Sequence, residues 1–387
     1  MKKNIIFALL MLCMVQSAWA QKEQFNPVQH GVTSLMVAPD SRGGGMGDVG
    51  AATDPDVYSQ FWNPAKYPFN IARAGLGISY TPWLRQLVSD MDLAYVSGFY
   101  RIGDYSALSG ALRYFSLGEV GIGEYDAKGE PINTINPYEM AIDVAYSRML
   151  SETFSAAVAL RFIYSDLAWT EDGITPGSAF AADIAFYYNN YVLLGQRECM
   201  LGLGANISNI GSKISYDEGN TSEFVPTNFR IGASLLIPID EYNTISFSAD
   251  ANKLLVPTRP MELDGEDDED YQNRLHKDYY DLSPITGIFK SFSDAPGGTS
   301  EELKEIQWSV GAEYMYNNQF AVRAGYHHED PYKGNRKYWT VGAGFKMSVF
   351  SLDASYIISV AQTNPLDQTL RFSMSFDMDG LRDIFGR

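Results

Sequence analysis

The chain has 387 residues, of which 29 are basic and 47 acidic, so its formal net charge at pH 7 is −18. Such an acidic protein repels the phosphate backbone, which argues against nucleic acid as a partner. Two cysteines and four histidines are too few for a disulfide framework, a cysteine-based metal site or an obvious catalytic framework.

Residues 1–20 have the features of a removable secretory signal peptide. Two lysines follow the first residue, residues 5–15 form an apolar run, and Ala18-Trp19-Ala20 is typical of a cleavage site. The apolar run is too short to cross a bilayer as a helix. We therefore expect cleavage after Ala20, so that the mature chain begins at Gln21.

Residues 41–67 are too rich in Gly, Asp and Pro to form a strand or a long helix. Their glycines permit backbone turns that a Cβ atom would forbid. We interpret residues 21–70 as an N-terminal periplasmic and plug segment, tucked inside a barrel that the later residues form. Residues 45–50 also match G-x-G-x-x-G, but the strand and the βαβ repeats of a dinucleotide site are missing, so a plug turn is the better interpretation.

From residue 74 onward, apolar residues recur with a period of two, which is typical of strands. Between residues 139 and 147, for example, Met140, Ile142, Val144 and Tyr146 alternate with small or charged residues. The pattern predicts strands at residues 76–81, 91–100, 105–116, 139–147, 154–165, 180–188, 201–207, 229–237, 245–251, 306–316, 320–326, 339–347, 352–360 and 370–378.

Ten of these fourteen strands are about 9–12 residues long, close to the roughly 9–11 that cross a bilayer at a tilt and longer than the roughly 5–6 of soluble strands. Their second face mixes Gly, Ala and Ser with polar and charged residues, which suits a hydrated lumen but not the core of a sandwich. The charged and amide residues expected on this inner face are Glu139, Asp143, Arg161, Asp183, Asn206, Arg230, Asp250, Glu313, Arg323, Lys346, Asp353 and Arg371.

The prediction is therefore an all-β fold, a 14-stranded antiparallel transmembrane β-barrel over residues 71–378 with the N-terminal plug segment in its lumen. A soluble secreted β-sandwich or propeller is the alternative. That alternative has to explain why strand after strand carries one apolar face and one polar face.

Connection lengths agree with an outer-membrane barrel, whose periplasmic turns are short and whose outer loops are long. From a periplasmic N-terminus, short connections such as 101–105 alternate with long ones such as 117–136 and the extracellular loop 254–305. The connections at 189–198 and 361–367 are mild exceptions. An even number of strands returns the chain to the periplasm, where residues 379–387 would form a C-terminal tail.

The extracellular loop begins with an acidic stretch. Residues 262–270 carry seven acids in nine positions. A solvated, mobile charge run is the simplest interpretation. A divalent-cation site beside lipopolysaccharide and an acidic attraction for basic cargo are the alternatives, although the spacing lacks the ordered Asp pattern of a calcium loop.

Residues 282–292 of the same loop predict a short amphipathic helix. Ser283 suits the N-cap and Pro284 the first helical position. Apolar residues then recur every three or four positions along one face. This face either packs over the barrel mouth, or docks a partner or covers a small apolar ligand. The residues of this candidate partner-binding face are Leu282, Ile285, Ile288, Phe289 and Phe292.

No catalytic, cofactor or metal site is predicted, and the chain is not expected to be an enzyme. His327 and His328 are adjacent, so on a strand they point to opposite faces and would hardly share a metal ion. The sequence contains no nucleophile elbow, no H-E-x-x-H and no P-loop motif.

The order of these features resembles one known family. A signal peptide is followed by R-G-G-G-M-G at residues 42–47, by A-x-x-D-P-D-V-Y-x-x-x-x-N-P-A at residues 51–65, and then by fourteen strands. This arrangement resembles the FadL-like outer-membrane barrels, and among them the PorV (LptO) family of the type IX secretion system of Bacteroidetes. Beyond the N-terminal segment the resemblance is one of architecture and loop layout. The residues assigned to the lumen plug are Arg42, Gly43, Gly44, Gly45, Gly47, Asp54, Trp62, Asn63 and Pro64.

The resemblance implies a multi-pass outer-membrane barrel without a cofactor. It would bind secreted cargo through the cargo's C-terminal signal domain, receive it from the type IX translocon, and pass it to a cell-surface sortase for attachment to lipopolysaccharide. The alternative is a FadL-like channel that imports fatty acids or other hydrophobic small molecules. Such an importer needs an apolar pocket ending in a cation. The inner face offers arginines but is small and polar, which favours the first function; these arginines are Arg113, Arg161, Arg230, Arg323 and Arg371.

Overall fold

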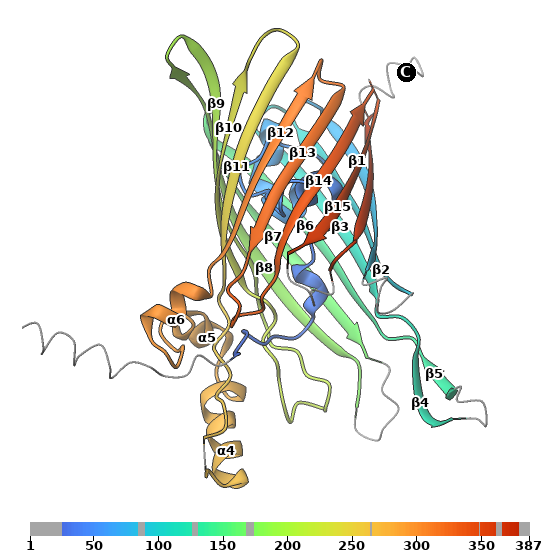
Figure 1. The fold of residues 1–387 in the computed structure, drawn as a ribbon, viewed down its shortest axis with the longest axis vertical. Helices are drawn as coiled ribbons and strands as arrows, with labels where there is room; N and C mark the ends of the chain where they lie inside the picture. The colour runs from blue at the N-terminus through green and yellow to red at the C-terminus, as the bar shows by residue number, and fades with distance from the viewer. Residues whose placement is uncertain are drawn as a thin grey trace, which may run out of the picture.

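A computed structural model describes residues 25–83, 90–125, 131–167, 174–263, 265–347, 349–360 and 366–378. Fourteen of its strands form one closed antiparallel barrel, in which the first strand pairs with the last (Figure 1). They are β1 (Ala74–Trp83), β2 (Met91–Ile102), β3 (Ser106–Ser116), β6 (Tyr138–Ser151), β7 (Phe154–Asp166), β8 (Gly177–Leu194), β9 (Arg197–Gly211), β10 (Asn228–Pro238), β11 (Asn243–Leu254), β12 (Gln307–Tyr316), β13 (Phe320–His328), β14 (Lys337–Lys346), β15 (Phe350–Ser359) and β16 (Leu370–Asp377). The predicted fourteen-stranded barrel is confirmed.

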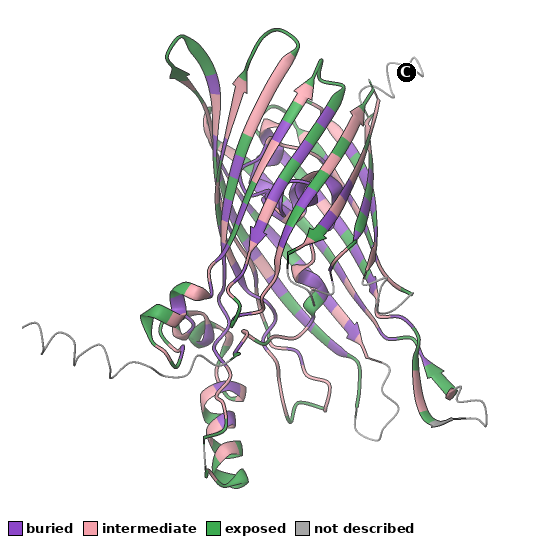
Figure 2. Cartoon of the chain, in the orientation of Figure 1, coloured by how far each residue is buried: buried purple, intermediate pink, exposed green. Residues whose placement is uncertain are grey.

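The strands carry their apolar side chains on the outside. On β6, Val144 is 59% exposed while its neighbours Asp143 and Ala145 are buried. Buried and more exposed positions also alternate along other strands of the wall, such as β7 and β13 (Figure 2). This is the reverse of a soluble sandwich and is what a lipid-facing wall around a polar lumen requires. Of the twelve inner-face residues expected from the sequence, all but Lys346 and Asp353 are buried.

Two strands were missed. β4 (Val120–Tyr125) and β5 (Pro131–Ile135) form a separate antiparallel hairpin within the connection expected at residues 117–136, and it projects away from the barrel (Figure 1). The connection at residues 189–198, which was longer than expected for its end of the barrel, is also explained. β8 and β9 continue past the expected strand ends until Leu194 pairs with Arg197, so this connection is a tight turn like the others at its end of the barrel.

The two ends of the barrel differ. One end, here called the short-turn end, holds tight turns such as that between β2 and β3. The other, the long-loop end, holds the β4–β5 hairpin and four helical segments: α4 (Asp268–Leu275), the π-helical η3 (His276–Tyr280), α5 (Pro284–Lys290) and α6 (Thr299–Lys304). Within the described ranges, no helix combines the length and the apolar composition needed to cross a membrane.

The N-terminal segment lies in the lumen as a plug of four short helical turns: η1 (Thr33–Met36), α2 (Ser41–Gly44), α3 (Ser59–Trp62) and η2 (Pro64–Phe69). It enters at the long-loop end, where the Asn26 amide donates to the Tyr332 carbonyl at 2.8 Å. It leaves at the short-turn end, where Arg101 donates to the Asn70 carbonyl at 2.8 Å. The start of the segment thus lies beside the long loops, whereas the sequence prediction assumed a periplasmic N-terminus, on the side of the short turns. The expected signal peptide and C-terminal tail lie outside the described residues.

Candidate functional site

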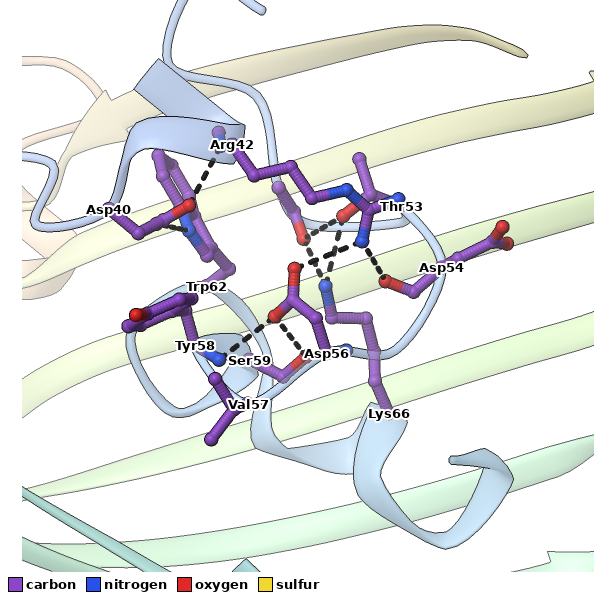
Figure 3. A network of polar contacts seen from close by, with 12 residues as sticks. Asp40, Arg42, Thr53, Asp54, Asp56, Val57, Tyr58, Ser59, Trp62 and Lys66 are labelled. Carbon is purple, nitrogen blue, oxygen red and sulfur yellow. Dashed lines mark hydrogen bonds and ion pairs between the residues drawn. The ribbon is translucent and has the colours of Figure 1, made fainter. Parts of the chain in front are cut away.

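Arg42 is the centre of an ion-pair network between the plug and the barrel wall. Its guanidinium lies 3.0 Å from the Asp56 carboxylate within the plug (Figure 3). It also lies 3.0 Å from Glu313 on β12. Glu313 also accepts from Arg323 at 2.6 Å, and Arg323 lies 2.6 Å from Asp353 on β15. The plug is therefore tied to three strands through charges that are largely removed from water, where loss of one partner is costly.

Trp62 fills the space between two glycines of the plug. A Cβ atom on Gly43 would lie 2.5 Å from the Trp62 ring, and one on Gly50 would overlap that ring outright. The indole Nε1 donates to Asp40 at 2.6 Å, and the other Asp40 oxygen accepts from the Gly43 amide at 2.8 Å (Figure 3). The glycines thus make room for a buried aromatic side chain that is 2% exposed.

Asn63 and Pro64 begin η2 and hold it against the wall. The Asn63 side chain accepts from the Ala65 amide at 3.0 Å, as an N-cap does, and Pro64 takes the first helical position. The Asn63 amide nitrogen donates to the carbonyls of Ala51 and Phe186, each at 2.9 Å. The Asn63-Pro64 pair is thus a local cap that also bonds to β8.

The remaining plug residues expected from the sequence act through close packing of their backbone or through a backbone carbonyl. Gly44 packs against Arg371, and Gly45 packs against Gly342 of β14. Gly47 has φ +78°, and a Cβ there would lie 2.7 Å from the Tyr326 backbone nitrogen. Asp54 offers its carbonyl to Arg42 at 3.1 Å, while its carboxylate points away from the Arg42 network (Figure 3).

Sequence reasoning missed several plug residues that make close polar contacts. Asp48 pairs with Arg371 at 2.7 Å, and the Lys66 ammonium donates to the Gly50 carbonyl at 2.9 Å. On the wall, Asp250 accepts from the Gly50 and Ala51 amides at 2.8 and 2.9 Å. Alternation had already placed Arg371 and Asp250 on the inner face, but nothing in the sequence indicated their partners in the plug.

Within the residues that the structure describes, cavities are found at both ends of the plug. The cavity at the short-turn end has a volume of about 410 Å³ and is lined by residues that include Arg42, Asp54 and Arg323. The cavity at the long-loop end has about 210 Å³ and is lined in part by Val28 and Lys333. Among the described residues, no cluster of His, Cys, Asp and Glu is arranged to hold a metal ion.

At the long-loop end, the predicted helix forms but its apolar face is turned outward. The Ser283 hydroxyl accepts from the Thr286 amide at 3.2 Å, which confirms the N-cap. Leu282 and Ile288 are half-buried. The other three apolar side chains are exposed to 57% at Ile285, 73% at Phe289 and 53% at Phe292, and are here called the α5 patch. The interpretation that this face packs over the barrel mouth is wrong for these three residues.

The opposite side of α5 holds the helix in place. Gly287 packs against Phe224 of the β9–β10 loop, where a Cβ atom would lie 2.6 Å from the ring. Beside it, the Lys213 ammonium donates to the carbonyls of Tyr279 and Tyr280 at 3.1 and 2.6 Å and lies 4.3 Å from the centre of the Phe224 ring. Burial lowers the pKa of Lys213 to about 8. The α5 patch is therefore displayed by a packed loop.

The entering N-terminal segment connects three long loops. Besides the bond to Tyr332, the Gly31 amide donates to the Phe224 carbonyl at 2.9 Å, and the Tyr279 hydroxyl donates to the Gln29 carbonyl at 3.1 Å. The plug and the long-loop surface are thus parts of one continuous contact network.

Comparisons with known proteins place these features in context. A family model described as "Type IX secretion system protein PorV" matches residues 20–261, more than half of the chain. No curated protein matches. Among solved structures, the TodX deltaS2S3 mutant monoaromatic hydrocarbon channel gives a TM-score of 0.51 at 10% identity, covering 87% of this chain and 98% of that chain.

Two further solved structures are similar at lower TM-scores. The CymD monoaromatic hydrocarbon channel gives 0.48 at 12% identity, covering 88% of this chain and 97% of its own. A Pseudomonas aeruginosa FadL homologue gives 0.43 at 13% identity, covering 88% and 99%. At such identities, the likeness to the TodX mutant supports the barrel fold alone.

Proposed function

Because the chain belongs to the PorV family of type IX secretion proteins, and so is an outer-membrane component of that secretion system, we propose that it binds secreted cargo through the cargo's C-terminal signal domain. It passes the cargo from the translocon to a cell-surface sortase. The outer wall contacts lipid and lipopolysaccharide, and the long-loop end faces the cell surface, as the lengths of the connections favour.

The observation that carries this proposal is the α5 patch. Two aromatic side chains and one aliphatic side chain are exposed together on a helix whose other side is fixed by packing. Exposed apolar patches of this kind mark sites of protein association, and aromatic residues supply much of the energy of such interfaces. A patch on a packed loop also loses little conformational freedom when a partner binds.

The second candidate, an importer of fatty acids, has support from the hydrocarbon-channel fold but little from the lumen. A fatty-acid site needs a cation at the end of an apolar pocket. Arg161, Arg323 and Arg371 are each paired with carboxylates of the wall or plug. The ion pairs of Arg42 would also have to break for the plug to move. These contacts favour the handover function.

Co-purification from native outer membrane tests the proposal. We expect the wild-type protein to bring down secreted proteins that share one C-terminal domain, together with sortase components, identified by mass spectrometry. A tightly bound fatty acid in a lipid extract, with no such proteins, would instead support import.

The α5 patch is tested by placing Asp at both Ile285 and Phe289. Loss of two exposed interface side chains should weaken cargo or sortase recovery by about tenfold or more, since interface anchors contribute roughly 1 kcal/mol or more each and each 1.4 kcal/mol is about tenfold in affinity. The heat-resistant barrel band on gels should remain. Leu263→Asp is the matched control, because Leu263 is an apolar residue of the same loop that is 61% exposed outside the patch. Equal recovery by all three proteins would remove the α5 patch from the interface.

A further inference from the structure

We infer that the outer edge of β5, which pairs with no other described strand, is a docking site at which an extended strand of the cargo adds to the β4–β5 hairpin as a third strand. The identity of the partner rests on the proposed function. The location of the site rests on the hairpin itself.

The hairpin has no partner sheet in the described part of the chain. β4 pairs with β5, and the pair stands apart from the closed barrel at the long-loop end (Figure 1). Every barrel strand has a neighbour on both sides, whereas each hairpin strand has one. Unpaired edges present a row of free N–H and C=O groups, and a two-stranded ribbon is only marginally stable in water. A third strand would form hydrogen bonds with these free groups and would stabilise the ribbon.

The two edges of the hairpin are not equivalent. β4 is irregular between Ile122 and Tyr125, where the pairing register shifts and Gly123 takes φ +74°. Bulges and charges are the usual devices that prevent strand addition. β4 is therefore the protected edge.

β5 lacks both devices. Its five residues, Pro-Ile-Asn-Thr-Ile, include no charge, its proline stands at the first position, and three of the five are β-branched. Ile132 is 57% exposed, and Asn133 and Thr134 are exposed as well. An uncharged, exposed edge rich in β-branched residues accepts another strand readily.

The edge defines the chemistry of its occupant. Only an extended backbone offers donors and acceptors at the spacing of an edge strand, which is the basis of recognition by strand addition. The stretch from residue 117 to 136 carries four acids and one lysine. We therefore assign the site to a cargo segment that is uncharged and β-branched at its centre and flanked by Lys or Arg.

Hydrogen exchange of the full-length protein with the purified C-terminal signal domain of a cargo protein tests the inference. In the free protein, the outward amides of residues 132–135 should exchange rapidly. With the domain bound, they should exchange about tenfold or more slowly, because each enters a backbone hydrogen bond, while amides of β4 stay unchanged.

Variants give a second readout. Ile132→Lys with Thr134→Lys should weaken binding of the signal domain about tenfold, which corresponds to roughly 1.4 kcal/mol, because the new charges oppose a basic partner and disfavour strand addition. Val120→Lys on the protected β4 edge is the matched control and should bind normally, since Val120 is also exposed, to 39%.

The outcomes separate the two proposals. Binding of the domain with neither protection of β5 nor an effect of its variants would overturn the docking site and leave the proposed function standing. No binding by the wild-type protein would overturn both. Protection of β5 in concentrated protein without cargo would identify a second copy of this chain as the occupant and overturn the assignment to cargo.

Discussion

Asp294 connects distant parts of the loop between β11 and β12. Its carboxylate accepts a hydrogen bond from the Thr258 amide at 2.9 Å. Burial raises the pKa of Asp294 to about 6, and the nearby carboxylates of Glu302 and Glu305 add to the increase. Because the pKa of Asp294 is higher in the folded loop than its value of 3.8 in the unfolded chain, its contribution to the stability of the loop is fully present below pH 3.8. This contribution is lost as the pH rises through about 6.

Asp294→Asn should therefore remove a pH dependence of the loop. In the wild type, we expect amides near Thr258 to exchange more slowly at about pH 5 than at about pH 7.5, after correction for intrinsic rates. The difference should shrink in the variant, whose side chain does not titrate. A pH dependence of equal size in both proteins would show that another group is responsible.

The helical turns of the plug pack closely because Gly43 of α2 and Gly50 of the following turn lie against α3, where any side chain would collide with it. Trp62 of α3 contacts both Gly43 and Gly50, and the ring leaves no space for a methyl group at either position. The fit of these short elements, which have few internal hydrogen bonds, should contribute much of the stability of the plug.

Gly50→Ala should destabilise the protein by about 1–3 kcal/mol, the usual cost of overpacking. The temperature at which the compact band converts to the unfolded band on gels is the measurement. Gly98→Ala is the matched control, because its Cβ atom would lie no closer than 3.3 Å to a neighbour. A conversion temperature lowered equally in both variants would contradict the assigned role of the Trp62 contact.

On the scale of the whole molecule, the barrel, plug and long loops behave as one connected body. The plug bonds to strands all around the wall and then to three long loops. A handover protein can use such a body without moving the plug, whereas an importer must move it. The two candidate functions therefore differ in what a locked plug would do.

A disulfide between Ser41→Cys and Ser373→Cys should lock the plug to β16. The two hydroxyl oxygens lie 3.1 Å apart, and Cys199 is buried and so should not interfere. We expect the oxidised variant to bind cargo as the wild type does. Cargo binding that is lost on oxidation and restored by reductant would show that the plug moves during function. Ser41→Cys alone controls for the substitution.

The barrel was predictable because its determinants are local. Alternation on β6 or β12 follows from side chains two positions apart, and the same pattern placed Asp250, Glu313 and Arg371 on the inner face. The Ser283 cap was predictable for the same reason, since it involves residues three positions apart. The β4–β5 hairpin was missed because its strands have only 6 and 5 residues, too few for a period of two to stand out.

By itself, the sequence determined the membrane barrel, its fourteen strands, the difference between its ends and the location of the plug. Each depends on patterns that recur over a few residues, which solvent and lipid select directly. Only the tertiary structure decided that Arg42 pairs with Glu313, 271 positions away, that the plug enters beside the long loops, and that the α5 patch faces outward. These features depend on which distant surfaces meet, and a helix with one apolar stripe is equally compatible with covering a barrel mouth or with binding a partner.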